Sequence, residues 1–441
     1  MILFCVVADL VACTNDDVLE KTVDKEEMDL VQYDPNRRSY AEALEIAQNS
    51  IRMLQDENST ARSAEPARTL DLKNGVKAVR QTVTRSNGTV SGNDTLLYIF
   101  NFEDGRGFSV VSASRRTDGL IAVTETGHYD PEVKTGNPGF DMYIYLLNSR
   151  IDNRPPTIDT TFNGFGPFYD YEILEESEVE PLLTVKWGQN QPYNLACPQN
   201  VHNTGVSPAG CVAIAIAQIM TYHEYPNSYI RKYHNVDNIV PQNIDWNDIK
   251  RHVITSSCDY SCDYISISQL IREIGYRANI RYGEYDTTTG LYQSWTYTND
   301  AYSSILSFGY GVNSVQSYSF ASIKTELNNF RPVYMSGGIT GVTIGHAWVA
   351  DGYYHKTERM TEYYETGIGG DRIIISETPI HTKHLHINWG WDGEGNGYFN
   401  DGVFRPSNPV SLDSPSLPSN NSGNYNDPTQ LCMITGISPL D

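Results

Sequence analysis

The sequence predicts an α+β fold built from two units. Residues 182–441 show a strong helix pattern first and strand patterns later, which is typical of an α+β domain with two lobes. Residues 19–155 form a smaller unit with mixed helix and strand signals. Between them, residues 156–181 follow the Pro155-Pro156 break, and the stretch from Asp170 to Glu180 contains six acidic residues and no basic one. Such a run repels itself, so we expect an extended, solvated connector.

The overall charge excludes two classes of function. The 441 residues include 32 basic and 54 acidic side chains, a net charge of −22. A nucleic-acid-binding protein needs a basic face to displace counterions, so this class is excluded. Docking on anionic lipid through charge alone is excluded for the same reason. Residues 1–181 hold 17 basic and 31 acidic residues, so most of the excess charge belongs to the first part of the chain.

The first 18 residues resemble an export signal. The stretch MILFCVVADLVA is mostly apolar, and Leu10-Val11-Ala12-Cys13 is similar to a bacterial lipobox, in which the cysteine becomes lipidated. No Lys or Arg precedes the apolar run, and Asp9 interrupts it, which departs from the usual pattern. We expect residues 1–18 to be a signal or lipoprotein-like segment with lipidation at Cys13, and the protein to be secreted or an outer-surface lipoprotein. The alternative is an exposed tail. No other run approaches ~18 apolar residues, so no transmembrane span is expected.

The smaller unit is predicted from local patterns. Residues 36–55 have apolar residues at three- and four-residue steps, which predicts a helix with Ala41, Leu44, Ala47 and Ile51 facing inward. Residues 56–95 are polar and predicted to be rich in loops. The remaining predictions are strands at 96–101, 107–112 and 120–123, with a turn at 103–105, and a helix at 142–151 with Tyr145, Leu146 and Ile151 facing inward.

The larger unit contains one distinctive helix. Residues 211–223 are apolar or small nearly all round, so this helix should be buried. Strand patterns occur later, at residues 332–335, 343–353, 372–376, 385–391 and 431–434.

Cys211 begins this helix and is the first chemical candidate. Partial positive charge at a helix N-terminus lowers the pKa of a thiol and favours the thiolate, which is a nucleophile when an imidazole lies nearby. The alternative is a buried, unreactive cysteine.

A nucleophile needs a base, and His346 is the strongest of ten histidines. It lies in an alternating strand pattern in which His346 and Trp348 share a face, and Gly345 before it leaves room for a substrate backbone. His386 is the rival candidate. His223 ends the cysteine helix and is interpreted as structural.

A third pattern follows His386, in residues 388–391. The amide of Asn388 could accept the imidazole N–H and fix its tautomer, while two tryptophans exclude water. The next residues, Asp392, Glu394 and Asn396, have the spacing of the start of an EF-hand, but the twelfth position is Val403, so no metal site is predicted. The segment is interpreted as a flexible glycine loop beside the site.

Four blocks now carry a resemblance. Residues 187–194, 210–220, 345–353 and 388–391, in this order, resemble the streptopain family of papain-like cysteine peptidases. The resemblance implies a two-lobed, papain-like peptidase domain at 182–441, preceded by an inhibitory α+β pro-domain at 19–155.

The family also implies roles for single residues. Cys211 would be the nucleophile, and His346 would take and return the proton. Gln189 would point its amide into the oxyanion hole, and Asn388 would orient the imidazole unless a tryptophan or a backbone group does so.

Three further residues are expected at the substrate cleft. Gly345 and Gly290 would line it. Trp389 is expected to contribute to substrate binding as well and to pack by the imidazole. No cofactor is implied.

The resemblance predicts a bacterial endopeptidase made as a zymogen. Its partners would be protein or peptide substrates, with a hydrophobic preference near the cut, and its own pro-domain as an intramolecular inhibitor. The alternatives are a non-enzymatic protein and a transglutaminase-like enzyme on the same fold. His346 and Asn388 are 42 residues apart, longer than is usual for the family, so residues 355–384 are interpreted as a hairpin-like surface insertion at the rim of the cleft.

Overall fold

The computed structural model describes most of residues 37–440. The residues within that span that it does not describe are 55–67, 85–89, 116, 132–136, 138–139, 141–142, 145–146, 148–167, 234–240, 252–262, 287–290, 339–344, 366–371 and 402–430. Residues 1–18, with Cys13, also lie outside the described part. No helix in the described ranges is both long and apolar enough to cross a membrane.

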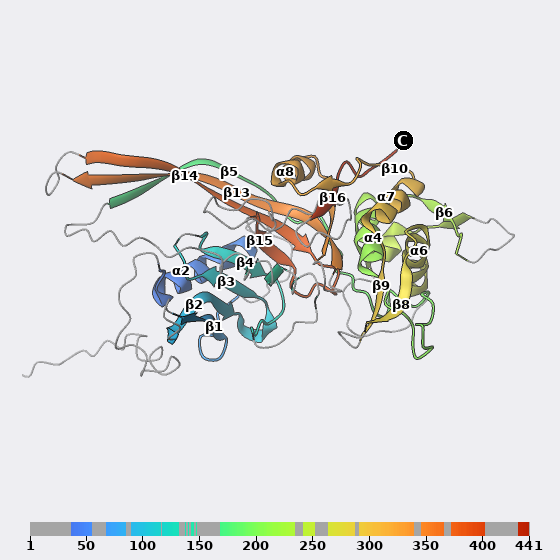
Figure 1. The fold of residues 1–441 in the computed structure, drawn as a ribbon. Coiled ribbons are helices and arrows are strands. Elements are labelled where there is room, and N and C mark those ends of the chain that lie inside the picture. The colour runs from blue at the N-terminus through green and yellow to red at the C-terminus, as the bar shows by residue number, and fades with distance from the viewer. Residues whose placement is uncertain are drawn as a thin grey trace, which may run out of the picture.

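The smaller unit is a helix against a meander of strands (Figure 1). Its elements are α2 (Tyr40–Ser50), η2 (Ile51–Leu54), β1 (Val76–Thr84), β2 (Val90–Asn101), η3 (Glu103–Gly105), β3 (Phe108–Ser112) and β4 (Leu120–Thr124). The predicted strands and turn are confirmed, whereas β1 falls in a stretch that was predicted to be loop-rich.

The first helix prediction for this unit is confirmed in position and for three of its four inward-facing residues. A capping box formed by Ser39 and Glu42 starts α2. Ala47 and Ile51 are buried and Leu44 packs half-buried on the cluster of Ala47, as predicted, whereas Ala41 is exposed and Ala43 is buried instead. Further along, the residues predicted to face inward in the second helix lie outside the described part, and the buried residues there are Phe140, Tyr143 and Leu147.

The larger unit has most of its helices and several short strands on one side and its long strands on the other (Figure 1). Its helices are α4 (Cys211–His223), α5 (Trp246–Arg251), α6 (Asp263–Arg277), α7 (Thr298–Ser307) and α8 (Phe320–Asn328). Its strands are β5 (Phe168–Val179), β6 (Ser228–Ile230), β7 (Pro241–Asn243), β8 (Arg281–Asp286), β9 (Leu291–Trp295), β10 (Tyr310–Gly311), β11 (Gln316–Ser317), β12 (Val333–Gly338), β13 (Gly345–Glu365), β14 (Arg372–Asn388), β15 (Gly397–Asn400), β16 (Cys432–Ile434) and β17 (Ser438–Pro439).

Both units share one antiparallel sheet. Its strand order is β1-β2-β3-β4-β15-β14-β13-β12-β16-β11. Strand β5 also pairs with β13, at residues 353–363, beyond the part of β13 that pairs with β12. The junction is the β4–β15 ladder, in which Gly397, Tyr398 and Phe399 pair with Thr124, Val123 and Ala122. A continuous hydrophobic core crosses this junction, because Phe108 and Phe140 belong to the same cluster as Trp389 and Phe399. The smaller unit, expected to be the pro-domain and called the pro-unit below, is therefore joined through both backbone and side chains to the larger unit, the expected peptidase unit.

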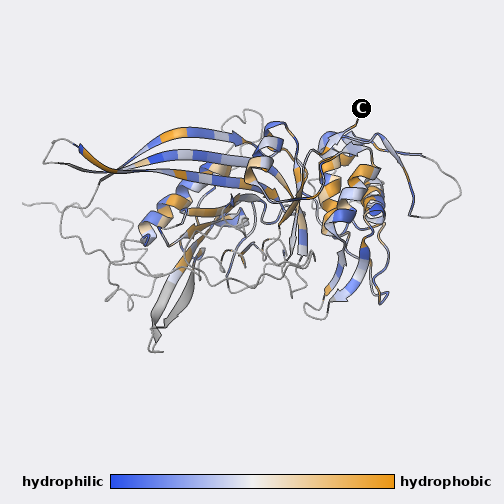
Figure 2. Ribbon diagram, turned by 45° about the horizontal axis from the view of Figure 1, so that its top comes forward, coloured by the Kyte–Doolittle hydropathy of each residue, from blue (hydrophilic) through white to orange (hydrophobic). Residues whose placement is uncertain are grey.

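The other face of the sheet packs on helix α4. Strand alternation sends Ala347 and Val349 to this face and Trp348 and Ala350 to the opposite one. Figure 2 shows α4 as a largely apolar helix within the helical lobe. Ten of its thirteen residues are buried, as its all-round apolar pattern predicts.

Strands β13, β14 and β5 extend away from both units as a long arm (Figure 1). His346 lies near the start of β13 and Tyr363 lies 17 residues later, about 55 Å away at ~3.3 Å per residue. The hairpin character predicted for residues 355–384 is confirmed. Its predicted place at the cleft rim is wrong, because the paired strands continue outward from the cleft.

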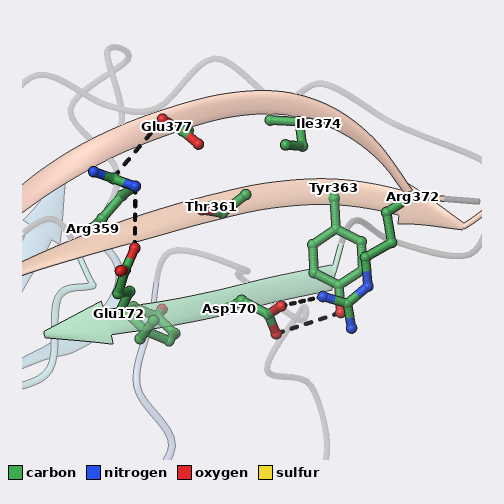
Figure 3. Close-up of a pocket in the computed structure, with 9 residues that line it drawn as sticks. Asp170, Glu172, Arg359, Thr361, Tyr363, Arg372, Ile374 and Glu377 are labelled. Carbon is green, nitrogen blue, oxygen red and sulfur yellow. Dashed lines mark hydrogen bonds and ion pairs between the residues drawn. The ribbon is translucent and has the colours of Figure 1, made fainter.

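The acidic connector is a strand of this arm. Residues 168–179 pair with β13 instead of forming a free linker. Figure 3 shows the reason: Arg372 lies against Asp170, and Arg359 lies 3.1 Å from Glu172. These side chains line a hollow of ≈ 460 Å³ on one face of the arm. The cross-strand arginines offset the self-repulsion that predicted a solvated linker.

Candidate active site

Gly210 sets the start of the cysteine helix. Its φ of 89° lies in the left-handed region, which only glycine adopts without strain, and Cys211 follows as the first residue of α4. The N–H of Ala209 donates to the carbonyl of Gln189 at 2.8 Å. This bond holds the backbone of Gln189 beside the segment that leads into Cys211, so the two residues expected to form the oxyanion hole lie on adjoining segments.

Strand β13 brings His346 to the same place. His346 is 4% exposed and pairs with Gly337 of β12. The thiol of Cys211 interacts with the backbone of Ala347, the next residue on the strand. Helix α4 and strand β13 therefore meet at this point, next to the two residues that the sequence predicts as nucleophile and base.

The indole rings of Trp348, Trp389 and Trp391 surround the imidazole, with ring centroids 6.0–6.3 Å from it. Nε2 of His346 lies 2.7 Å from the carbonyl oxygen of Trp389 and 3.2 Å from Nε1 of Trp391. The group that faces the imidazole is therefore a backbone carbonyl.

Asn388 was predicted to contact the imidazole of His346 directly, but the hydrogen bonds of its amide go to other groups. Its Nδ2 donates to the carbonyl of Val185 at 2.9 Å, and its Oδ1 accepts from the N–H of Gly390 at 3.1 Å. Asn388 thus holds the turn that carries Trp389. The backbone carbonyl of Trp389 faces the imidazole, where the side-chain amide of Asn388 was predicted. The sequence alone left a backbone group open as an alternative.

Burial sets the protonation of both candidate residues. Burial lowers the pKa of His346 to about 4, against a smaller opposing effect of the Trp389 carbonyl. Burial raises the pKa of the Cys211 thiol, although backbone contacts favour the thiolate. The pair is therefore a neutral thiol and a neutral imidazole in this state. The pKa of the thiol is therefore raised, not lowered as predicted from the helix N-terminus, because desolvation outweighs the contacts with the backbone of Ala347, Val212 and Cys211.

The three residues expected at the cleft are Gly345, Trp389 and Gly290, and the first two differ in their exposure. Gly345 is exposed, and a Cβ added to it would contact only Gly337 O at 3.6 Å, so packing does not require glycine there. Trp389 has no exposed surface, so it packs the imidazole and is not a wall of the cleft. Gly290 lies outside the described residues. Gln189 is 8% exposed, at the edge of the site.

The rival histidine has a different environment. Nδ1 of His386 lies 2.7 Å from Asp351, and its Nε2 lies 3.3 Å from Glu125 of the pro-unit. Burial alone would lower the pKa of His386, but the two carboxylates raise it to about 10. Glu125 also contacts Lys186. His386 is therefore an ion-paired residue between the two units and lacks the free lone pair that a base needs.

The pro-unit also contacts the loop after Trp391. Thr126 Oγ1 donates to the carbonyl of Gly393 at 2.6 Å, and Asn137 Nδ2 donates to that of Glu394 at 3.2 Å. Asn396 connects this loop to the site, because its Oδ1 accepts the N–H of Trp389 at 3.0 Å. Sequence reasoning treated this loop only as a flexible glycine loop.

Comparisons with known proteins identify the fold family. The Peptidase C10 family model matches residues 187–399, and the model described as Spi protease inhibitor matches residues 35–151. Streptopain of Streptococcus pyogenes serotype M1 is 27% identical over 353 residues, which cover 73% of this chain and 77% of streptopain. The chain belongs to the streptopain family of cysteine peptidases.

Two further proteins are similar to this peptidase. The Thiol protease/hemagglutinin PrtT of Porphyromonas gingivalis is 23% identical over 367 residues, covering 78% of this chain and 37% of that protein. The solved prointerpain A fragment of Prevotella intermedia matches with a TM-score of 0.51 at 21% identity, covering 83% of this chain and all of the fragment. The peptidase thus has the papain-like α+β fold preceded by an α+β pro-unit, and it is a cysteine endopeptidase.

Proposed function

We propose that Cys211 and His346 are the catalytic pair of this endopeptidase. The observation that supports this assignment is the thiol of Cys211 against the backbone of Ala347, directly beside His346. No other described histidine has this relation to Cys211, and His386 is held by two carboxylates.

The reaction follows from these positions. His346 removes the thiol proton, and the Sγ of Cys211 forms a bond to the carbonyl carbon of the scissile peptide. Gln189 and the N–H of Cys211 bind the resulting oxyanion, each donor contributing roughly 3 kcal/mol of transition-state stabilisation. The imidazolium returns its proton to the leaving amine, which leaves a thioester. His346 then deprotonates a water molecule, whose attack releases the acid and restores the thiol.

The proposal extends to maturation and location. Residues 19–155 would inhibit the peptidase until they are removed, supported by the inhibitor-family match at 35–151 and by the contacts of Glu125 and Thr126 with the peptidase unit. Export from a bacterial cell, with Cys13 as a lipid anchor, is supported by the lipobox-like sequence. Protein substrates with a hydrophobic residue near the cut are the expected class.

Substitution of the pair tests the assignment. Full-length chain and its Cys211→Ala and His346→Ala variants are incubated with casein and a fluorogenic peptide, and chain length is followed with time. Cys432→Ala is the matched control, because Cys432 is also a free, partly buried thiol. We expect cleavage of the substrates and shortening of the chain to be lost in Cys211→Ala and His346→Ala and to persist in Cys432→Ala. Retention of activity by Cys211→Ala overturns the assignment.

A further inference from the structure

Helix α4 contains one buried amide that catalysis as described above does not use. Gln218 has no exposed surface and lies among the apolar residues of this helix. A buried amide is costly unless its polar atoms are bonded, so its partners show what it does. Gln218 follows Cys211 by seven residues, about 10 Å along the helix at ~1.5 Å per residue.

Both ends of this amide bond to segments of the active site. Its Oε1 accepts the N–H of Trp187 at 3.1 Å. Its Nε2 donates to Oδ1 of Asn388 at 3.3 Å. Trp187 lies two residues before Gln189, and Asn388 lies directly before Trp389, whose carbonyl faces His346. One side chain thus connects the nucleophile helix to the oxyanion segment and to the turn that orients the base.

The directions of these bonds leave Gln218 a single orientation. The N–H of Trp187 can only donate, so the oxygen of the amide must face it. Oδ1 of Asn388 already accepts from Gly390, so the NH2 of the amide must face Asn388. Nδ2 of Asn388 continues the chain of bonds to the carbonyl of Val185. Each polar atom of the two amides, Oε1 and Nε2 of Gln218 and Oδ1 and Nδ2 of Asn388, has at least one partner, and such bonding lets a buried polar network specify one arrangement.

We propose that Gln218 is a positioning residue of the peptidase: it fixes the Gln189 segment and the Trp389 turn relative to Cys211, so that the thiol, the imidazole and the oxyanion donors are held in register. This inference rests on the proposed roles of Cys211, His346 and Gln189. It assigns Asn388 an indirect role, as the partner through which Gln218 acts on the turn of Trp389.

The isosteric variant Gln218→Glu gives the sharpest test. Its carboxylate still accepts the Trp187 N–H, but when ionised it places an oxygen against Oδ1 of Asn388. When protonated, the acid donates there as the amide does. Burial raises the pKa of such a carboxyl, so the native pattern returns as the pH falls. We expect kcat at pH 8 to fall about 10- to 100-fold, and the ratio of mutant to wild-type kcat to rise between pH 8 and pH 5, with KM little changed.

Two further variants separate positioning from plain stability. Gln218→Met keeps the volume and removes both bonds, so its kcat should stay low at every pH. Thr221→Val is the matched control, because Thr221 is buried on the same helix and its hydroxyl bonds only to the carbonyl of Ala217. It should lower the thermal midpoint and leave kcat unchanged.

All variants are measured as the mature form obtained from the full chain, at temperatures where each is folded. A mutant-to-wild-type ratio for Gln218→Glu that stays flat with pH, or an equal loss of kcat in Thr221→Val, overturns the proposal. Cys211→Ala is assayed alongside. Its activity reports on the proposed nucleophile, whereas the pH-dependent ratio reports on Gln218 alone, so the two failures are distinguishable.

Discussion

The carbonyl oxygen of Trp389 lies 2.7 Å from Nε2 of His346. A carbonyl can only accept, so the neutral imidazole must carry its proton on Nε2. The indole N–H of Trp391, 3.2 Å from the same nitrogen, then has no lone pair to donate to. The free lone pair is on Nδ1, and this is the atom available to take a proton from Cys211.

The tautomer can be observed directly. In the full-length Cys211→Ala chain, the ¹⁵N resonances of His346 should show a protonated Nε2 and an unprotonated Nδ1 at neutral pH. The titration midpoint should lie near the value of about 4 to which burial lowers its pKa. The signal is assigned by its loss in His346→Gln. A proton on Nδ1 contradicts the geometry.

His386 predicts how stability changes with pH. Its folded pKa of about 10 lies above the unfolded value near 6.5, so its stabilising effect is complete below pH 6.5 and is lost as the pH rises through 10. The urea midpoint of the full-length Cys211→Ala chain should therefore fall between pH 7 and pH 10. The same chain with His386→Gln should show a flatter profile over this range. Parallel profiles would show that this ion pair makes no contribution.

Glu125 is predicted to anchor the pro-unit. It contacts both His386 and Lys186, and these contacts hold the pKa of its carboxyl well below the usual range despite burial. Glu125→Gln should weaken the hold on the peptidase unit by roughly 1.5–3 kcal/mol, the net worth of a hydrogen bond to a charged group. Gel analysis of the full-length chain should then show faster loss of the pro-unit.

Asp130→Asn is the control for this experiment. It makes the same carboxylate-to-amide change beside Lys77, within the pro-unit. Its processing rate should match that of the wild type, and equal acceleration in both variants contradicts a specific anchor.

Two glycines at the site are predicted to respond differently. An alanine at Gly345 meets only an ordinary contact, so Gly345→Ala should keep its thermal midpoint while kcat/KM for peptides falls, because the methyl group occupies the exposed side of the strand. Gly210→Ala forces a residue with φ 89° into strain and should lose about 1–3 kcal/mol of stability by urea unfolding. If Gly345→Ala cleaves peptides at the wild-type rate, it does not line the cleft.

The sequence predicted elements wherever a buried face left a periodic signal. Helix α4 is buried nearly all round and was predicted from that pattern. The full lengths of β13 and β14 were not predicted, because neither outer part shows hydrophobic alternation. The outer part of β13 has charged and polar residues at half-buried positions, and the outer part of β14 is exposed on both faces, with Ile373, Ile374 and Ile375 in a row. β5 was missed for a related reason: its acidic run is neutralised by Arg359 and Arg372, which are remote in sequence.

The site was predictable in its residue types and less so in its bonds. The thiol of Cys211 interacts with the backbone of Ala347, beside His346, and the catalytic roles of Cys211 and His346 stay predictions. Which atom faces the imidazole depended on backbone geometry, since the side chain of Asn388 and the carbonyl of Trp389 are one residue apart. Gln218 did leave a signal, because a lone amide in an apolar helix implies a fixed buried partner.

Because β4 pairs with β15, the pro-unit can leave only if backbone hydrogen bonds between these two strands break. Its departure exposes the edge of β15 that faced β4 at Gly397, Tyr398 and Phe399, so the backbone groups on that edge pass to water while the edge paired with β14 stays bonded. Backbone hydrogen bonds depend little on most side chains. The sequences of β4 and β15 can therefore change while the two strands still pair in the same register. An exposed edge of only three residues offers few backbone groups for pairing with a strand of another molecule.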